Sequence, residues 1–258
     1  MKYYMVDTFT DEVFGGNPAG VCILDKEISS EVMQLIAKQH NLPETAFVLK
    51  EKDKYFLRWF TPKFEIDLCG HATLASAFVM MNYIEKENSS IIFSTQSGLI
   101  EVIRNDNKYE MSLPIRKPTK IEITEEIKEL LGVTPYEVYS SRDLIVVLSS
   151  EEEVINYEPN YDNLMKLSNW LGIVVTAEGN KANFVSRYFC PELKEEDPVT
   201  GSSHCSLVPY WSERLGCTEL YAQQLSERKG ELYCNLEDNS VKVAGEARLY
   251  MVGEIKYE

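Results

Sequence analysis

The chain has 258 residues, of which 44% are hydrophobic and 26% charged, an ordinary composition for a globular protein with one large domain or two small ones. Its 26 Lys and Arg residues against 41 Asp and Glu give a net charge of −15, which repels phosphate backbones and anionic lipid surfaces. We therefore expect neither a nucleic-acid partner nor a membrane partner.

The first half of the chain predicts many short strands and two helices. Ser29 and Ser30 are helix-capping residues before an amphipathic helix over 31–40. Residues 68–84 contain no charged side chain, but they are too few to span a bilayer, so we expect a buried helix. Runs rich in β-branched and aromatic residues predict strands at 3–7, 20–24, 46–49, 55–60, 91–94, 99–103 and 109–113.

The second half repeats this order after a Pro-containing polar linker around 114–122. Residues 198–212 form a second uncharged stretch and predict a second buried helix. Segment 248–258 carries another strand pattern that can return to the first half. Outer helices are expected at 125–131 and 162–171, and strands at 145–148, 183–189 and 241–245.

An internal repeat of half-chain length supports two related domains. The segment 58–62, RWFTP, resembles 187–191, RYFCP, and 69–72, CGHA, aligns with 200–203, TGSS. A wholly apolar helix in a β-rich half is best explained as the element that the sheet encloses. We therefore expect an α+β fold of two pseudo-symmetric β-barrel-like domains, each wrapped around a central buried helix. The expected domains are 1–116 with 248–258, and 117–247.

The two buried helix starts are candidate anion-binding positions. Unpaired N–H groups and the helix dipole favour an anion there, and the small residues Gly70 and Gly201 allow close approach. If the two halves are related by a pseudo-twofold axis, the starts can face each other with a carboxylate or enolate between them. The alternative is that both glycines only let the chain turn into a crowded helix start.

His71 follows Gly70 in the first helical turn, where the helix dipole is expected to lower its pKa and favour a neutral ring. Such a ring can donate a hydrogen bond to a substrate oxygen. A capping or core histidine is the alternative interpretation. His204, in the second buried helix, is expected to pack or to bond to the backbone.

Three further side chains are candidates, each with an ordinary structural alternative. Asp197 precedes Pro198, which keeps it out of helical angles, and it serves either the site or a turn. Ser202 is a donor to a bound carboxylate or a helix cap. Glu44 lies between a helix and a strand, and a carboxyl group near apolar neighbours can have its pKa raised enough to move protons near neutrality. Taken alone, Glu44 is one of many glutamates, and an exposed side chain without a role in a site is its default interpretation.

Five blocks of the sequence together form a recognisable pattern. They are 7–10 (DTFT), 14–21 (FGGNPAGV), 44–47 (ETAF), 58–62 with 67–73 (DLCGHAT), and 196–202 (EDPVTGS). In family order and over nearly the whole chain, they resemble the PhzF-like family of phenazine biosynthesis. The resemblance implies the diaminopimelate-epimerase fold and a homodimer.

The resemblance also implies a cofactor-free isomerase that moves a proton within a cyclic dihydro-hydroxy amino acid in a biosynthetic process. The family's acid/base glutamate matches Glu44, and its supporting residues match His71, Asp197 and Ser202. Gly70 and Gly201 match its ligand-facing turns. We therefore expect a small-molecule carboxylate as substrate.

Two alternatives stay open. Related racemases and epimerases use two thiols, one at each helix start; Cys69 occupies the first of these positions, but Thr200 occupies the second and cannot supply a thiolate. An amino-acid racemase or epimerase would need Cys69 with some other base. A non-catalytic small-acid-binding protein is the other alternative.

The cysteines and the missing motifs bear on cofactors and compartment. The six cysteines are scattered without CxxC pairs, and no secretory leader pattern opens the sequence, so we expect reduced thiols, a cytoplasmic location and no metal. The sequence has no GxxxxGK, GxGxxG or HExxH motif, so we expect no cofactor.

Overall fold

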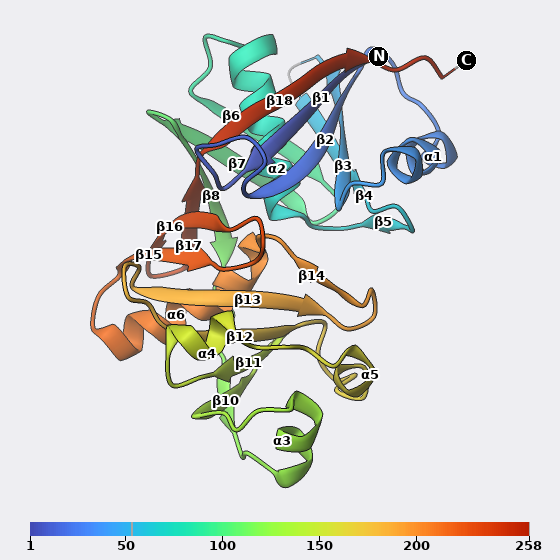
Figure 1. Ribbon diagram of the computed structural model, residues 1–258. Coiled ribbons are helices and arrows are strands. Elements are labelled where there is room, and N and C mark those ends of the chain that lie inside the picture. The colour runs from blue at the N-terminus through green and yellow to red at the C-terminus, as the bar shows by residue number, and fades with distance from the viewer. Residues whose placement is uncertain (53, 258) are drawn as a thin grey trace. The chain divides into compact units, whose positions relative to one another are not determined.

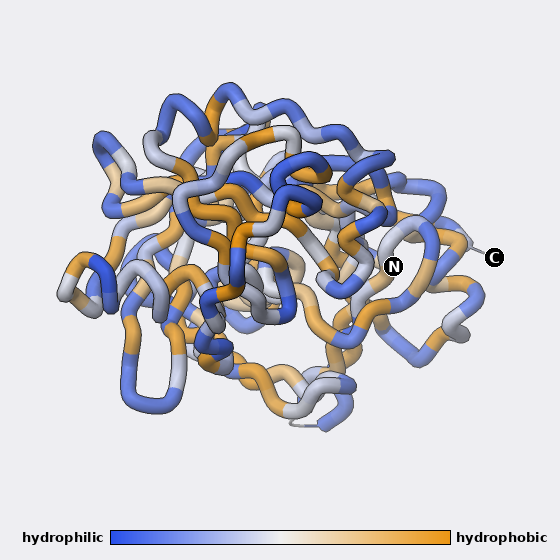
Figure 2. Tube along the Cα trace, turned by 90° about the horizontal axis from the view of Figure 1, so that it is seen from below, coloured by the Kyte–Doolittle hydropathy of each residue, from blue (hydrophilic) through white to orange (hydrophobic). Residues whose placement is uncertain are grey.

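A computed structural model describes every residue of the chain except 53 and 258. The chain divides into two compact units, unit 1 with Met1–Ser112 and Ala244–Glu258, and unit 2 with Leu113–Val243. Both boundaries lie a few residues N-terminal of those expected from the sequence. Much of the inner trace is hydrophobic, whereas hydrophilic segments lie mainly in the outer loops (Figure 2).

Unit 1 is a mixed sheet that is closed at one side by the end of the chain. Strand β1 pairs antiparallel with β2 and with β18. Strands β2 and β3 are parallel, β3 and β4 antiparallel, and β4 and β6 parallel, followed by antiparallel β7 and β8. The bounds are β1 (Lys2–Thr8), β2 (Asn17–Leu24), β3 (Glu44–Glu51), β4 (Lys54–Phe60), β5 (Glu65–Ile66), β6 (Ser90–Thr95), β7 (Gly98–Asn105), β8 (Lys108–Pro114) and β18 (Ala247–Glu254).

Helix α2 (Gly70–Val79) is the buried core helix of unit 1, and all ten of its residues are buried. It contacts β1, β2 and β3, behind which it lies in Figure 1. Its polar side chains do not need solvent, because the hydroxyls of Thr73 and Ser76 donate to backbone carbonyls one turn earlier. A π-helical turn, η1 (Met80–Ile84), completes the uncharged segment. The predicted buried helix is confirmed.

Unit 2 repeats this strand pattern. Strand β10 pairs antiparallel with β9 and β11, β11 is parallel to β12, β12 and β13 are antiparallel, and β13 is parallel to β15. Strand β15 then pairs antiparallel with β16. The bounds are β9 (Thr119–Ile121), β10 (Glu137–Ser140), β11 (Leu144–Val147), β12 (Ile173–Glu178), β13 (Phe184–Cys190), β14 (Glu195–Asp197), β15 (Glu219–Gln224), β16 (Gly230–Leu236) and β17 (Ser240–Gly245).

The second core helix begins at His204, later than the start at Gly201 that the sequence predicted. A 3-10 turn, η2 (Gly201–Ser203), precedes α6 (His204–Leu215), which is buried from His204 to Ser212 and contacts β15 and β16. The two units therefore share one arrangement, a mixed sheet around a buried helix. The expected α+β fold of two pseudo-symmetric β-barrel-like domains is confirmed.

The internal repeat extends to matching side-chain contacts. In unit 1, Arg58 on β4 donates through Nε and Nη2 to the carboxylate of Glu65 on β5, at 2.7 Å in both cases. In unit 2, Arg187 on β13 makes the same two-point contact with Glu196 on β14, at 2.8 Å. In each unit, one bidentate ion pair thus fixes the short strand, β5 or β14, to the longer strand beside it.

The outer helices show what local signals can and cannot predict. Helices α1 (Ser30–His40) and α3 (Glu125–Leu131) begin where the caps Ser29 and Thr124 accept a hydrogen bond from the first turn. The helix expected at 162–171 is wrong, because α5 covers only Tyr161–Leu164. A short helix, α4 (Glu151–Ile155), was not predicted. Tertiary hydrogen bonds explain the first error: Trp170 donates to Ser140 Oγ, and the Leu171 N–H donates to the Arg142 carbonyl.

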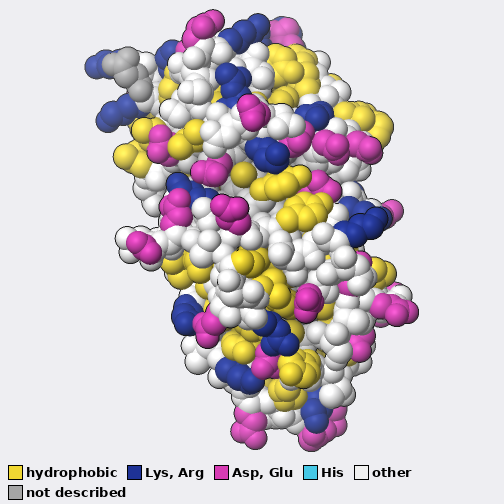
Figure 3. All heavy atoms as spheres, turned by 90° about the vertical axis from the view of Figure 1, so that its left-hand side faces the viewer, with side chains coloured by type: hydrophobic (Ala, Val, Ile, Leu, Met, Phe, Trp, Pro, Cys, Tyr) yellow, Lys and Arg dark blue, Asp and Glu magenta, His cyan; other side chains and the backbone are white. Residues whose placement is uncertain are grey.

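The surface fits the acidic composition. On the face drawn in Figure 3, acidic and basic side chains are interspersed, and the described residues there form no continuous basic patch. Among the described residues, no helix is both long enough and apolar enough to cross a membrane.

Candidate functional site

Unit 1 brings Glu44, His71, Cys69 and Asn17 together. Glu44 is the first residue of β3, Asn17 the first of β2, and Cys69 and His71 flank the first residue of α2. Nε2 of His71 lies 3.1 Å from Oε2 of Glu44, while its Nδ1 lies 3.3 Å from Nδ2 of Asn17 and 3.5 Å from Sγ of Cys69. The imidazole ring therefore bridges the carboxylate to the interior of the unit.

The local sequence explains why Asn17 reaches this ring. Gly16 has a φ of +59°, and a Cβ there would lie 2.0 Å from the Thr8 carbonyl oxygen, so only glycine fits this turn. The carboxylate of Asp7 accepts a hydrogen bond from the Phe14 N–H at 2.9 Å and closes the same loop. Asn17 lies in the family block 14–21, but its residue type and position indicated no role.

Glu44 and His71 differ in their solvent exposure. The side chain of Glu44 is 17% exposed, against 6% for His71, so the carboxylate is the member that a ligand in solvent can approach. The Nε2–Oε2 contact is close but is not aligned as a hydrogen bond. Such alignment commonly tightens only when a ligand is bound.

The electrostatics of His71 differ from the expectation. Burial by itself lowers the pKa of His71, but negative charge beside the ring, of Cys69 when it is ionised and of the Glu44 carboxylate, outweighs this and raises the pKa well above its usual value. The expectation of a lowered pKa from the helix dipole is therefore wrong, because a carboxylate 3.1 Å away acts more strongly than the partial charges of the helix end.

Cys69 is a poor base in this environment. Burial and then the nearby Glu44 carboxylate raise the pKa of its thiol, which disfavours the thiolate. Donor atoms of Glu44, Cys69 and His71 lie within 4.8 Å of one another, as in some metal centres. However, Cys69 is next to Nδ1 and Glu44 next to Nε2, and one ion binds only one nitrogen of a ring. The arrangement therefore fits proton transfer better than metal binding.

Unit 2 contains the other predicted site residues. Asp197 ends β14, and its carboxylate accepts a hydrogen bond from the Thr200 hydroxyl. Gln224, buried at the end of β15, accepts from the Thr200 N–H at 2.8 Å and donates to the Asp197 carbonyl at 2.7 Å. The loop that contains Asp197 is thereby fixed from both sides. Nothing in the local sequence pattern singled out Gln224.

Ser202 and His204 have distinct surroundings. Ser202 lies inside the turn η2, and its hydroxyl oxygen accepts a hydrogen bond from Arg142 at 3.0 Å. His204 is fully buried with Nδ1 3.0 Å from the Thr200 carbonyl oxygen, and burial lowers its pKa to about 4. The prediction that His204 packs or bonds to the backbone is confirmed. Glu44, Gly70 and His71 thus belong to unit 1, whereas Asp197, Gly201 and Ser202 belong to unit 2.

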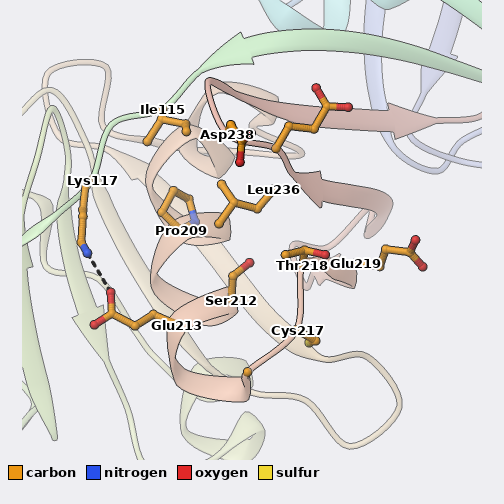
Figure 4. Close-up of a pocket in the computed structure, with 12 residues that line it drawn as sticks. Ile115, Lys117, Pro209, Ser212, Glu213, Cys217, Thr218, Glu219, Leu236 and Asp238 are labelled. Carbon is orange, nitrogen blue, oxygen red and sulfur yellow. Dashed lines mark ion pairs between the residues drawn. The ribbon is translucent and has the colours of Figure 1, made fainter.

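A separate surface pocket of 850 Å³ in unit 2 contains no predicted site residue. Its charged lining is mostly acidic, and its one lysine, Lys117, pairs with Glu213 at 2.9 Å, as Figure 4 shows. An anionic substrate would be repelled there. The lining residues are Ile115, Lys117, Pro209, Ser212, Glu213, Gly216, Cys217, Thr218, Glu219, Leu236, Glu237 and Asp238.

Comparison with known proteins gives concordant matches. Residues 6–253 match the family described as "Phenazine biosynthesis-like protein". An uncharacterized isomerase of Pseudomonas aeruginosa is 44% identical over 99% of this chain and 98% of its own length. The crystal structure of a phenazine biosynthesis PhzC/PhzF protein from Clostridium difficile superposes with a TM-score of 0.97 at 59% identity, covering 100% of both chains.

A distant structural match extends the fold similarity beyond these relatives. The crystal structure of a probable proline racemase from Agrobacterium radiobacter superposes with a TM-score of 0.69 at 8% identity, covering 100% of this chain and 93% of the other. At this identity the match speaks for the fold alone. It agrees with the epimerase-like architecture of two related units.

Proposed function

The chain is an isomerase of the phenazine biosynthesis-like family, and we propose that it moves a proton within a small anionic substrate, cyclic or amino-acid-like, without a cofactor. The observation that supports this most directly is the contact of 3.1 Å between Glu44 and His71. It pairs a solvent-accessible carboxylate with a buried imidazole at the start of α2.

Glu44 acts as the acid/base group in this proposal. Its carboxylate takes a proton from one substrate carbon and returns it to another, so atoms and charge balance without a redox partner. His71, with its raised pKa, provides a positive charge or a hydrogen-bond donor beside Glu44 and orients the carboxylate. Asp197 orients a polar group of the substrate.

The substrate carboxylate requires donors as well. In the proposal, the Ser202 hydroxyl and the backbone N–H groups at Gly70 and Gly201 bind it and stabilise the negative charge that develops when the carbon loses its proton. Glu44 and His71 belong to unit 1, and Ser202 belongs to unit 2. We also propose that the chain works as a homodimer and in the cytoplasm. Light scattering of the purified protein tests the dimer.

The test follows proton transfer directly. Wild type and Glu44→Gln are incubated in D₂O with dihydro-hydroxyanthranilate and a panel of cyclic and amino-acid carboxylates, and NMR monitors isomerisation and deuterium uptake. Wild type is expected to react, and Glu44→Gln to be slower by about 10²- to 10⁴-fold. Glu51→Gln, at the exposed far end of the same strand, is the matched control and is expected to keep full activity. Full turnover by Glu44→Gln would refute the role of Glu44.

The non-catalytic alternative is tested with the same panel. A protein that only binds small acids would show saturable binding by NMR titration, with neither isomerisation nor deuterium uptake in the wild type. Reaction of any panel member in a Glu44-dependent manner would exclude this alternative.

A further inference from the structure

Arg142 links Ser202 to the buried carboxylate of Asp143, and the proposed mechanism uses neither Arg142 nor Asp143. It lies in the turn between β10 and β11, and its Nη2 donates to Ser202 Oγ at 3.0 Å. The same guanidinium pairs with Asp143, with Nη2 3.0 Å and Nε 3.3 Å from Oδ2. One side chain thus contacts the candidate substrate-binding hydroxyl and a carboxylate at the same time.

The Asp143 carboxylate is itself held in place by its neighbours. The side chain of Asp143 is only 3% exposed, and its Oδ1 accepts a hydrogen bond of 2.9 Å from the Tyr188 hydroxyl. Burial and the Asp143 charge raise the pKa of Tyr188 well above its usual range, so the phenol stays a donor. Tyr188 packs onto Gly172, where an added Cβ would lie 2.2 Å from the tyrosine ring. Any side chain at position 172 would displace Tyr188 from Asp143.

Hydrogen-bond chemistry then determines what Ser202 can do. A guanidinium has donors and no acceptor, so Ser202 Oγ must accept from Arg142. The hydroxyl has a single proton, which is left to donate to another group. Arg142 is 26% exposed, whereas the carboxylate that balances its charge is buried behind it. A ligand approaching Ser202 therefore meets a hydroxyl donor with a cation next to it, which is a combination that selects a carboxylate.

We propose that Arg142 is a positioning residue that fixes the Ser202 hydroxyl as a donor to the substrate carboxylate, supported by Asp143 and Tyr188. The inference rests on the proposed function, because it assumes that Ser202 binds the carboxylate. It adds a specificity determinant in unit 2 at a residue that lies outside the five family blocks.

Binding, not turnover, is the first readout. Calorimetric titration with 3-hydroxyanthranilate and with its carboxamide separates recognition of the carboxylate from recognition of the ring. Wild type is expected to prefer the acid. Arg142→Gln is expected to weaken binding of the acid by about tenfold to a hundredfold and to change binding of the amide little, because a hydrogen bond to a charged group is lost.

A double-mutant cycle distinguishes a positioning role from an independent one. In a Ser202→Ala background, Arg142→Gln is expected to cost less than about a further twofold in affinity for the acid, since the residue acts through the missing hydroxyl. Full additivity of the two changes would overturn the proposal. So would equal affinity of the wild type for acid and amide, or no binding of the acid.

Folding controls keep the test interpretable. Arg142→Gln leaves Asp143 buried without its cation, so Arg142→Gln with Asp143→Asn removes both charges and preserves the fold more reliably. This pair must show the same loss of acid binding, and unchanged binding would overturn the proposal. Arg214→Gln, at an ion pair with Glu137 elsewhere in unit 2, is the matched control and is expected to bind normally.

Turnover separates this inference from the proposed function. With a substrate identified in the D₂O panel, Arg142→Gln is expected to raise KM and to lower kcat less than Glu44→Gln does. If Glu44→Gln is fully active but the cycle between Arg142 and Ser202 is non-additive, the mechanism fails and the inference about carboxylate binding stands.

Discussion

The carboxylate of Glu44 lies 3.1 Å from the buried ring nitrogen Nε2 of His71, at the point where β3 and α2 both begin. The two residues come from different sequence blocks, and neither block by itself indicates a contact. The pair is accessible from the glutamate side only, since Asn17 and Cys69 lie against the other ring nitrogen. This asymmetry makes Glu44 the group that meets substrate and His71 the group that supports it.

The titration of His71 is the most direct physical check on this pair. Its midpoint in an NMR pH titration is expected above 6.5 in the wild type, because the Glu44 carboxylate favours the charged ring. In Glu44→Gln the midpoint is expected to fall, since burial then acts with less opposition. A midpoint that does not move would show that Glu44 does not set the charge of the ring. The assignment control is His71→Gln, from which the signal must vanish.

Cys69→Ala is expected to retain isomerase activity within a few-fold of wild type. The buried thiol has a raised pKa and supplies little thiolate, and its partner position at the other helix start is Thr200. The measurement is initial rate on the substrate that the D₂O panel identifies. The thiol-racemase alternative predicts the reverse pattern, with activity lost in Cys69→Ser and kept in Glu44→Gln.

The two repeated ion pairs are expected to differ in their contribution to stability. Arg187 is 14% exposed and also donates to the carbonyls of three residues, 154, 155 and 157, so Arg187→Met should cost about 3–5 kcal/mol of unfolding free energy. Arg58 is 31% exposed, and Arg58→Met should cost about 1–2 kcal/mol.

Urea denaturation of the two arginine variants measures this difference. Lys128→Met, which removes an ion pair on the surface of α3, is the control and is expected to stay within about 0.5 kcal/mol of wild type. Equal losses for Arg58→Met and Arg187→Met would contradict the view that burial and the carbonyl contacts set the size of the effect.

His204 is expected to make the protein less stable in mild acid. Its pKa is lowered to about 4 in the fold against 6.5 in the unfolded chain, so its stabilising contribution is complete above pH 6.5 and is lost as the pH falls toward 4. The full difference amounts to about 3 kcal/mol. Unfolding free energies of wild type and His204→Asn, measured from pH 7 to pH 4, isolate this contribution from the carboxylates. Parallel curves for the two proteins would contradict it.

Part of the fold could be predicted because its signals are local. Ser29 and Thr124 cap the helices that they were expected to cap, since a capping hydroxyl acts on the next turn of its own chain. The two uncharged segments could only be buried, and in the structure they form the buried core helices of the two units. Strand β12, by contrast, was not predicted, although 173–176 has the same β-branched composition as the predicted strand at 145–148.

The candidate site divides in the same way. The family blocks and the glycines at the helix starts could be found in the sequence alone, and residue type and position made His71, Asp197 and Ser202 candidates. Glu44 was selected only through the resemblance of its block to the PhzF-like family. Three contacts could be seen only in the folded chain: Asn17 and Cys69 share the ring of His71, Gln224 holds the Asp197 loop, and Arg142 donates to Ser202. These contacts join residues from separate strands and turns, and the direction of the His71 pKa depends on them, since charges act through space and not along the chain.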